Sequence, residues 1–122
     1  MGQLRELVTP LHESTKRDYL ARMNDHKIEC MVHAKRYDRS YWDGDRRYGY
    51  GGYHYIPGRW KPVAESLIDV YSLTNKSCVL DVGCGKGYLL YELKLLLPGL
   101  EVSGIDVSEY GIRNAKQEIT DS

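Results

Sequence analysis

The sequence predicts an α/β fold in its second half, and three observations favour it. The run Ser77 to Val82 has the apolar character of a buried-type strand, and Val102 to Ile105 forms a second short apolar run. Between them, Tyr88 to Leu97 carries leucine at helical spacing and stops at Pro98-Gly99. Strand, glycine-rich turn, helix and strand make a βαβ unit, whose two strands are expected to be parallel.

The other helices are predicted from caps and from apolar periodicity. Thr15 to Asp18 has the spacing of a capping box that opens a helix through Met23, and Asp25 is expected to cap a second helix. Pro62 suits the first turn of a further helix, and Ser108 is expected to cap the last one. The apolar faces assigned to the helices are Ile28, Met31, Val32 and the stem of Lys35; Val63, Leu67, Val70 and Tyr71; Leu89, Leu90, Leu93, Leu96 and Leu97; and Ile112, Ala115 and Ile119.

The chain divides into two parts. Residues 1–75 are expected to form a helical N-terminal extension, and residues 76–122 the α/β part. At about residues 37–60 the extension loses any sustained period and becomes rich in tyrosine, glycine and arginine. We call residues 37–60 the aromatic segment.

Composition disfavours several classes of protein. Lysine plus arginine equals aspartate plus glutamate at 17 each, so no overall charge points to nucleic acid or to an acidic membrane. No apolar run approaches the roughly 18 residues of a membrane span, and the N-terminus lacks the pattern of a signal peptide. Cys30, Cys78 and Cys84 form no CxxC pair, so we expect reduced thiols in a cytoplasmic protein. The histidines lack the spacing of a metal site, and no metal is expected.

The first strand leads into the glycine-rich stretch VLDVGCGKG, residues 79–87. A phosphate-binding loop would need GxxxxGK followed by serine or threonine, but Gly85-Lys86 is followed by Gly87. A dinucleotide loop would need GxGxxG, but the position of its third glycine holds Tyr88. The spacing present is GxGxG, so both of these ligand classes are disfavoured.

Two carboxylates favour a different ligand. Asp81, at the end of the first strand, would repel a pyrophosphate and attract an ammonium or sulfonium group. Asp106, at the end of the second strand, stands where an acidic side chain accepts hydrogen bonds from ribose hydroxyls. Together they indicate a cationic ligand that carries a ribose, and S-adenosylmethionine has those parts.

The stretches DVGCGKG and GIDVS resemble the first motif and the following acidic motif of class I S-adenosylmethionine-dependent methyltransferases. The resemblance implies a Rossmann-like S-adenosylmethionine-binding fold and direct transfer of the methyl group to an acceptor. On the matching motif positions it implies cofactor contacts from Asp81, Gly83, Cys84, Gly85 and Gly87, and ribose and adenine contacts from Asp106 and Val107. The stretches STKRDYLARMND and GYGGYHYIPGRWKP resemble a subgroup of bacterial small-molecule methyltransferases, which implies a small-molecule acceptor.

The aromatic segment has three interpretations. From Lys35 to Lys61 there are seven basic and three acidic residues, with six tyrosines and two tryptophans. Such a composition suits a nucleic-acid surface, a lid or wall over the cofactor pocket, or a mobile surface loop. The zero net charge of the whole chain makes a nucleic-acid surface the weaker alternative. In the lid interpretation, Arg59 pairs with the carboxylate of the cofactor, and nearby tyrosines face its sulfonium.

Class I methyltransferases continue for several more strands, so the chain is expected to be an N-terminal part truncated after its second strand–helix unit. An incomplete sheet exposes unpaired backbone and apolar side chains, and self-association is the expected consequence. The alternative function for such a part is a module that binds S-adenosylmethionine without turnover.

Overall fold

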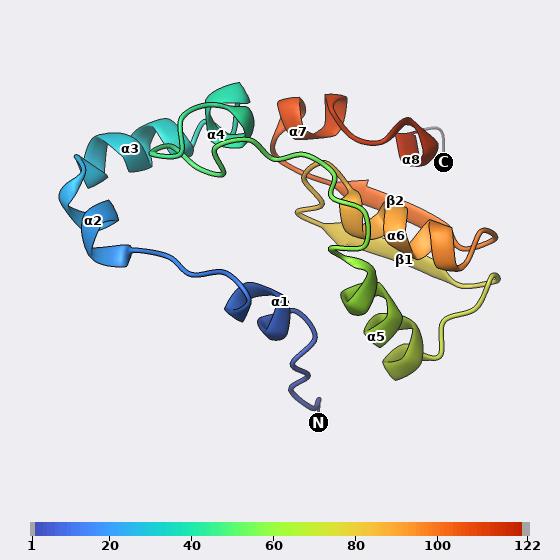
Figure 1. Ribbon diagram of the computed structural model, residues 1–122. Helices are drawn as coiled ribbons and strands as arrows, with labels where there is room; N and C mark the ends of the chain where they lie inside the picture. The colour runs from blue at the N-terminus through green and yellow to red at the C-terminus, as the bar shows by residue number, and fades with distance from the viewer. Residues whose placement is uncertain (1, 121–122) are drawn as a thin grey trace.

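The computed structural model describes residues 2–120, and within them a two-stranded parallel sheet carries its helices on one face (Figure 1). The elements in chain order are α1 (Thr9–Glu13), α2 (Tyr19–Asn24), α3 (Lys27–Ala34), α4 (Arg39–Asp43), α5 (Lys61–Tyr71), β1 (Cys78–Val82), α6 (Tyr88–Leu96), β2 (Glu101–Ile105), α7 (Glu109–Arg113) and α8 (Gln117–Thr120).

The sheet confirms the predicted parallel strands and corrects their burial. β1 and β2 pair in parallel from Cys78 opposite Glu101 to Val82 opposite Ile105. Alternate residues point to opposite faces, and one face packs against the helices. On the other face Leu80, Val82 and Ile105 are 61%, 73% and 54% exposed. The expectation that β1 is a buried-type strand is therefore wrong for this face.

The core lies between α5, α6 and the helix-facing side of the sheet. Its buried members are Ala64, Leu90, Leu93, Leu100 and Val102. The predicted helix with leucine spacing is confirmed as α6, and the helix with proline in its first turn is confirmed as α5. The apolar side predicted for α5 is right for its first turns but wrong at its end, where the last two apolar residues are exposed.

In the N-terminal arm, which comprises α1 to α3, two helices begin at other residues than predicted. Asp18, not Thr15, is the N-cap of α2, since its carboxylate accepts a hydrogen bond from the Ala21 N–H at 3.0 Å. The cap of α3 is His26 in a left-handed conformation rather than Asp25. Thr15 fails as a cap because its hydroxyl donates to a carbonyl of the preceding turn, His12.

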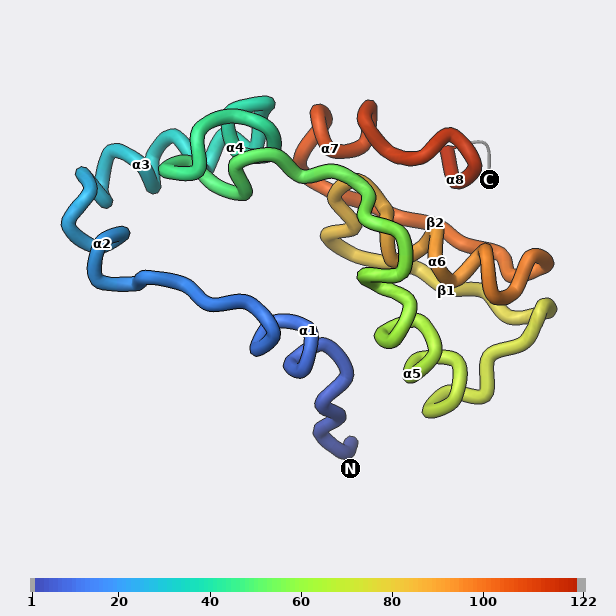
Figure 2. Tube along the Cα trace, viewed as in Figure 1, coloured from blue at the N-terminus to red at the C-terminus, as the bar shows by residue number. Residues whose placement is uncertain are grey.

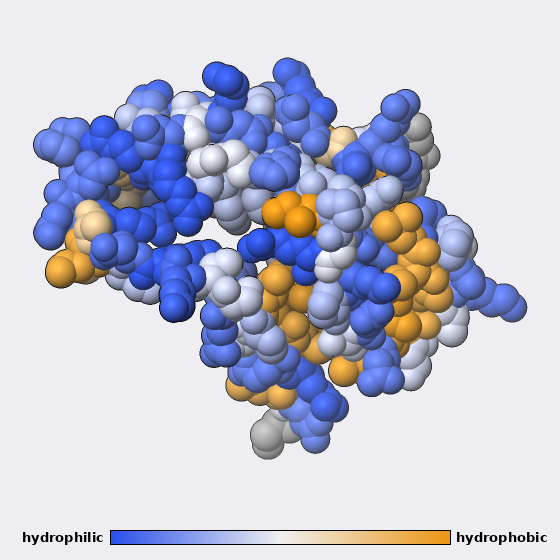
Figure 3. All heavy atoms as spheres, viewed as in Figure 1, coloured by the Kyte–Doolittle hydropathy of each residue, from blue (hydrophilic) through white to orange (hydrophobic). Residues whose placement is uncertain are grey.

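The apolar face predicted for α3 is not a core face within residues 2–120. Ile28, Met31 and Val32 are 81%, 49% and 60% exposed, and Cys30 is the buried residue of the helix. α3 packs mainly on α2 and α4 and lies away from the sheet (Figure 1). The trace at α2 and α3 runs apart from α5 and α6 (Figure 2), and the space-filling view shows an opening between these two parts (Figure 3).

The last predicted helix is interrupted. Ser108 caps α7 as expected, with its Oγ accepting from the Gly111 N–H at 2.9 Å. The helix stops at Arg113 and resumes as α8 at Gln117. Gly111 and Asn114 are weak helix formers, and the Asn114 side chain bonds the carbonyl of Tyr110 at 2.9 Å, which competes with the backbone ladder.

Candidate functional site

The expected cofactor residues converge at the carboxyl edge of the sheet. Residues 83–87 form the loop that leaves β1, and Asp106 and Val107 follow β2. The N–H groups of Gly83 and Cys84 both donate to the carbonyl of Ile105, at 2.7 and 3.1 Å. These bonds hold the glycine loop beside the end of β2, at the edge where ligands of open α/β sheets bind.

The three loop glycines have different surroundings. All have positive φ values, +84° at Gly83, +56° at Gly85 and +69° at Gly87, a region that side chains rarely adopt. A Cβ on Gly85 would lie 2.5 Å from the indole ring of Trp42, and one on Gly87 would lie 2.3 Å from Ile119. Around Gly83 no described atom lies within 4 Å of such a Cβ. Gly83 therefore offers open backbone to a ligand, while Gly85 and Gly87 also serve internal packing.

Asp106 joins the glycine loop to α7. One carboxylate oxygen accepts from the Gly85 N–H at 2.7 Å, and the other accepts from the Ser108 N–H at 2.7 Å. Each oxygen of a carboxylate has a second lone pair, so both can still accept from a ligand hydroxyl. The side chain is thus held in place and retains the capacity that a ribose contact needs.

Asp81 has no hydrogen bond or ion pair to its carboxylate within residues 2–120. Burial raises the pKa of Asp81, and the nearby negative charge of Asp106 raises it further. A carboxylate that is partly removed from water and lies near a like charge favours a cation beside it. This environment fits an ammonium or sulfonium group.

The remaining predicted site residues differ in environment. Cys84 is half-buried, and burial raises the pKa of its thiol, as do the charges of Asp81 and Asp106. The thiol is therefore a poor nucleophile. Val107 is 84% exposed and offers apolar surface at the sheet edge. Arg59 is exposed in the loop before α5, and within the described chain its guanidinium takes part in no ion pair.

The rings of the aromatic segment pack on each other and on the glycine loop. Trp42 is 6% exposed and stacks on Tyr50 with ring centroids 5.3 Å apart. Tyr50 contacts Tyr53, and Tyr53 stacks on Tyr88 of α6. Burial is the main cause that raises the pKa of Tyr53 to about 12. These contacts show that Trp42, Tyr50 and Tyr53 pack on one another and on α6, while residues 56–59 at the end of the segment are exposed.

Two residues of this region escaped sequence reasoning. Lys86 stands between two loop glycines, and its side chain pairs with Asp43 at the end of α4. The motif treats the position of Lys86 as variable, and Asp43 lies in a stretch without periodicity. The sequence did hold one signal for Lys86, because a long cationic side chain between two glycines after an apolar strand is unusual.

Residues 2–120 contain neither a helix that could span a membrane nor a cluster of side chains that could hold a metal ion. In residues 2–120 each helix is too short or too polar to cross a bilayer. Over the same residues, His, Cys, Asp and Glu side chains form no group of three or more that could hold a metal ion.

Comparison with known proteins supports a methyltransferase family for the second half of the chain. Residues 73–122 match a family model described as a methyltransferase domain, and this range contains the glycine loop, Asp81 and Asp106. Domains of this family generally use S-adenosylmethionine. No curated protein and no solved structure matches the chain significantly.

Proposed function

We propose that the chain forms the cofactor site of an S-adenosylmethionine-dependent methyltransferase that acts on a small molecule. The observation that carries the proposal is the open backbone of Gly83 between the two carboxylates Asp81 and Asp106. The family match to a methyltransferase domain supports the type of reaction. When bound, S-adenosylmethionine supplies an electrophilic methyl group on a positively charged sulfur.

Each residue of the edge has a role suited to its chemistry. Asp106 accepts hydrogen bonds from the ribose hydroxyls, and Asp81 attracts the cationic part of the ligand. Gly83 lets the backbone approach closely, and Val107 gives apolar surface to the adenine. Arg59, with a guanidinium unpaired within residues 2–120, is the proposed partner of the ligand carboxylate.

The aromatic segment supplies the wall beside this edge. Burial is the main cause that raises the pKa of Tyr41 to about 12, and the negative charge of nearby Asp106 adds a smaller increase. A wall of packed rings excludes water and fixes the orientation of the reacting groups, which is a large part of catalysis by positioning. The proposed acceptor is a small molecule, because the stretch GYGGYHYIPGRWKP in this region resembles bacterial small-molecule methyltransferases.

Calorimetric titration with S-adenosylmethionine and S-adenosylhomocysteine tests the proposal. Gly83→Ala should remove most binding, because the new methyl group occupies the open approach. Gly52→Ala is the matched control, since Gly52 also has a positive φ, +103°, with no described atom within 4 Å of an added Cβ. Equal affinity of the two variants for both ligands would refute the site. Transfer of a labelled methyl group to candidate acceptors would separate an enzyme from a binding module.

A further inference from the structure

Lys86 is a buried cation in the middle of the glycine loop. The residue is 5% exposed, and its Nζ donates to both carboxylate oxygens of Asp43, at 2.9 and 2.7 Å. It also donates to the backbone carbonyl of Tyr53 at 2.5 Å. All three donor hydrogens of the ammonium can therefore be used in contacts with the N-terminal extension.

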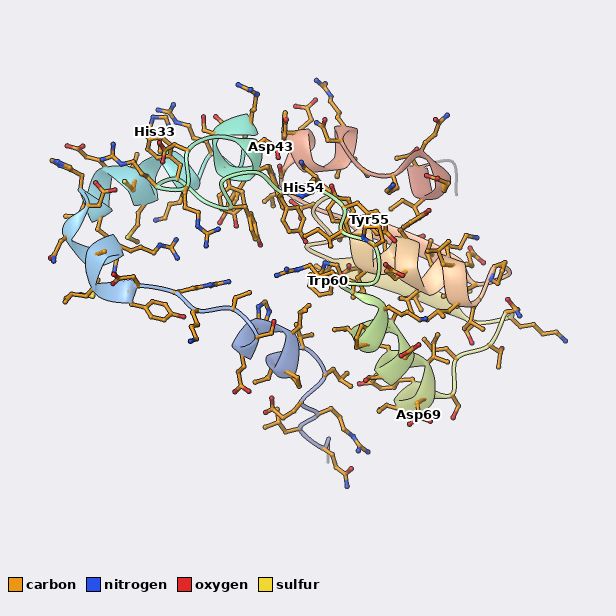
Figure 4. All side chains as sticks on the ribbon, viewed as in Figure 1. His33, Asp43, His54, Tyr55, Trp60 and Asp69 are labelled. Carbon is orange, nitrogen blue, oxygen red and sulfur yellow. The ribbon has the colours of Figure 1, made fainter. Side chains whose placement is uncertain are left out.

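Asp43 collects four hydrogen bonds from three parts of the chain. Besides the two from Lys86, it accepts from the Tyr53 N–H at 2.9 Å and from the Tyr110 hydroxyl of α7 at 2.8 Å. Burial acts to raise the pKa of Asp43, but the hydrogen bonds from Lys86, Tyr53 and Tyr110 outweigh it and hold the pKa below its ordinary value. Figure 4 shows Asp43 at the end of α4, beside α7.

The preceding residue makes a second joint at the same place. Trp42 lies against Gly85 of the loop and against Gly111 of α7. Its indole N–H donates to the Ser108 Oγ at 2.7 Å, and the Ser108 hydroxyl in turn donates to the Tyr37 carbonyl at 2.5 Å. Two consecutive residues of one short helix thus bridge the loop and α7.

A loop with three glycines at positive φ loses much conformational entropy when it is ordered. Backbone hydrogen bonds hold the loop to Ile105 and Asp106, and the Lys86 side chain is the charged contact that ties the loop to Asp43 of the N-terminal extension. Separating Lys86 from Asp43 leaves a charge uncompensated in a water-poor place, which is strongly unfavourable. The loop and the end of α4 are therefore expected to move together.

We propose that Lys86 and Asp43 are positioning residues whose ion pair, with Lys86 buried and Asp43 partly exposed, holds α4 against the glycine loop. The aromatic segment, which includes α4, is then a fixed wall of the cofactor site and not a lid that opens and closes. Ligand enters on the open side of the edge, at Gly83 and Val107. The part of this inference that concerns ligand affinity rests on the proposed function, whereas the docking of α4 does not.

The chain has two tryptophans, which gives a direct reporter of docking. In a Trp60→Phe background, all tryptophan emission comes from Trp42, and excitation at the red edge of tryptophan absorption avoids the tyrosines. The test variant is Lys86→Met, which keeps an unbranched side chain and removes the charge. The matched control is Lys61→Met, which removes the lysine of an exposed ion pair, Lys61 with Glu65 at 3.8 Å. Three quantities are measured: Trp42 emission, hydrogen exchange of the amides at residues 83–87, and affinity for S-adenosylhomocysteine.

In Lys86→Met we expect Trp42 emission to move to longer wavelength and amide exchange of the loop to become about tenfold faster or more. Affinity for S-adenosylhomocysteine should fall about tenfold or more, and the control should match the parent in all three. Unchanged emission and unchanged exchange would overturn the inference. Loss of docking with unchanged affinity would also overturn it, because the pair would then position nothing that the ligand needs.

A double variant keeps the test decisive if a single variant unfolds. Asp43→Asn leaves the Lys86 ammonium buried without its counter-charge, so it should be less stable than the double variant Asp43→Asn/Lys86→Met. Additive losses of stability would contradict the pair. If the parent fails to bind S-adenosylhomocysteine, the proposed function is wrong, and emission and exchange still decide whether Lys86 docks α4.

Discussion

Asp81→Asn should weaken cofactor binding without weakening the fold. The substitution keeps the shape of the side chain and removes its negative charge. In the parent, this carboxylate is partly buried near Asp106 and has no described cation or hydrogen-bond donor in residues 2–120, so its charge is unfavourable in the absence of ligand. A carboxylate whose negative charge is unfavourable in the free protein is typical of a binding site, because a bound ligand supplies the missing partner.

Linkage gives the sign of the effect on stability. The pKa of Asp81 is raised in the folded protein above its ordinary value of 3.8, so the folded state binds this proton more tightly than the unfolded state. Stability of the parent therefore falls as the pH rises from about 3.8 through the raised folded pKa. Asparagine does not titrate, so at pH 7 the variant should be at least as stable as the parent, and this advantage should shrink toward pH 3.

The effect on binding follows from the lost contact. A hydrogen bond to a charged group contributes about 1.5–3 kcal/mol, which corresponds to about 10- to 150-fold in affinity. If Asp81 faces the ammonium, affinity for S-adenosylmethionine and for S-adenosylhomocysteine falls by the same factor. If Asp81 faces the sulfonium, affinity for S-adenosylmethionine falls more, because the homocysteine compound lacks that charge.

Calorimetry at pH 7 and urea unfolding at pH 7 and pH 4 measure both effects. Asp69→Asn serves as the control, because it neutralises an exposed aspartate of α5 that lies far from the sheet edge (Figure 4). Unchanged affinity for both ligands would remove Asp81 from the site. A less stable Asp81→Asn variant at pH 7 would refute the argument that the free carboxylate is unfavourable.

Three further predictions follow from the packing. Asp106→Asn, unlike Asp81→Asn, should lower both ligand affinity and stability, the latter by about 1–3 kcal/mol, because one of two backbone N–H groups loses its acceptor; urea unfolding that shows no loss contradicts this role. Leu93→Ala should lower the free energy of unfolding by about 2–5 kcal/mol, since the side chain is fully buried, and a smaller loss would mean that the core collapses around it. The lowered pKa of Asp43 means that its ion pair stabilises the fold above the ordinary value of 3.8 and is lost as the pH falls through the folded pKa. The free energy of unfolding of the parent should therefore fall more between about pH 6 and pH 3 than that of Lys86→Met, in which the Asp43 pKa is no longer lowered by Lys86; equal losses would contradict the role of the pair.

Local pattern was sufficient for the elements that form the cofactor edge. The α6 helix was predictable because leucine recurs at its period and Pro98-Gly99 ends it. The start of α5 was predictable because Pro62 has no N–H to lose in a first turn. The parallel pairing of β1 and β2 followed from the βαβ order, and the placement of Asp81 and Asp106 followed from that pairing. These features depend on residues within a few positions of each other or on general rules of chain connection.

Local pattern failed where competing partners lie close together. The Thr15 cap lost to Asp18, and the predicted last helix broke near Asn114, because short polar side chains can bond either the helix end or a neighbouring carbonyl. The apolar face of α3 has the right period, but periodicity does not say which surface will cover it. Exposure of Ile28 was therefore beyond the reach of sequence reasoning.

The sequence by itself determined the glycine loop, its two carboxylates and the strand–helix–strand frame that brings them together. Tertiary structure alone decided that Trp42 covers Gly85, that Gly83 remains open, and that Lys86 reaches Asp43. Those contacts join residues about forty positions apart across a segment with no period of its own. Which side chain fills the space above a glycine, and which carboxylate compensates a buried ammonium, depends on how whole elements pack, and no local spacing encodes it.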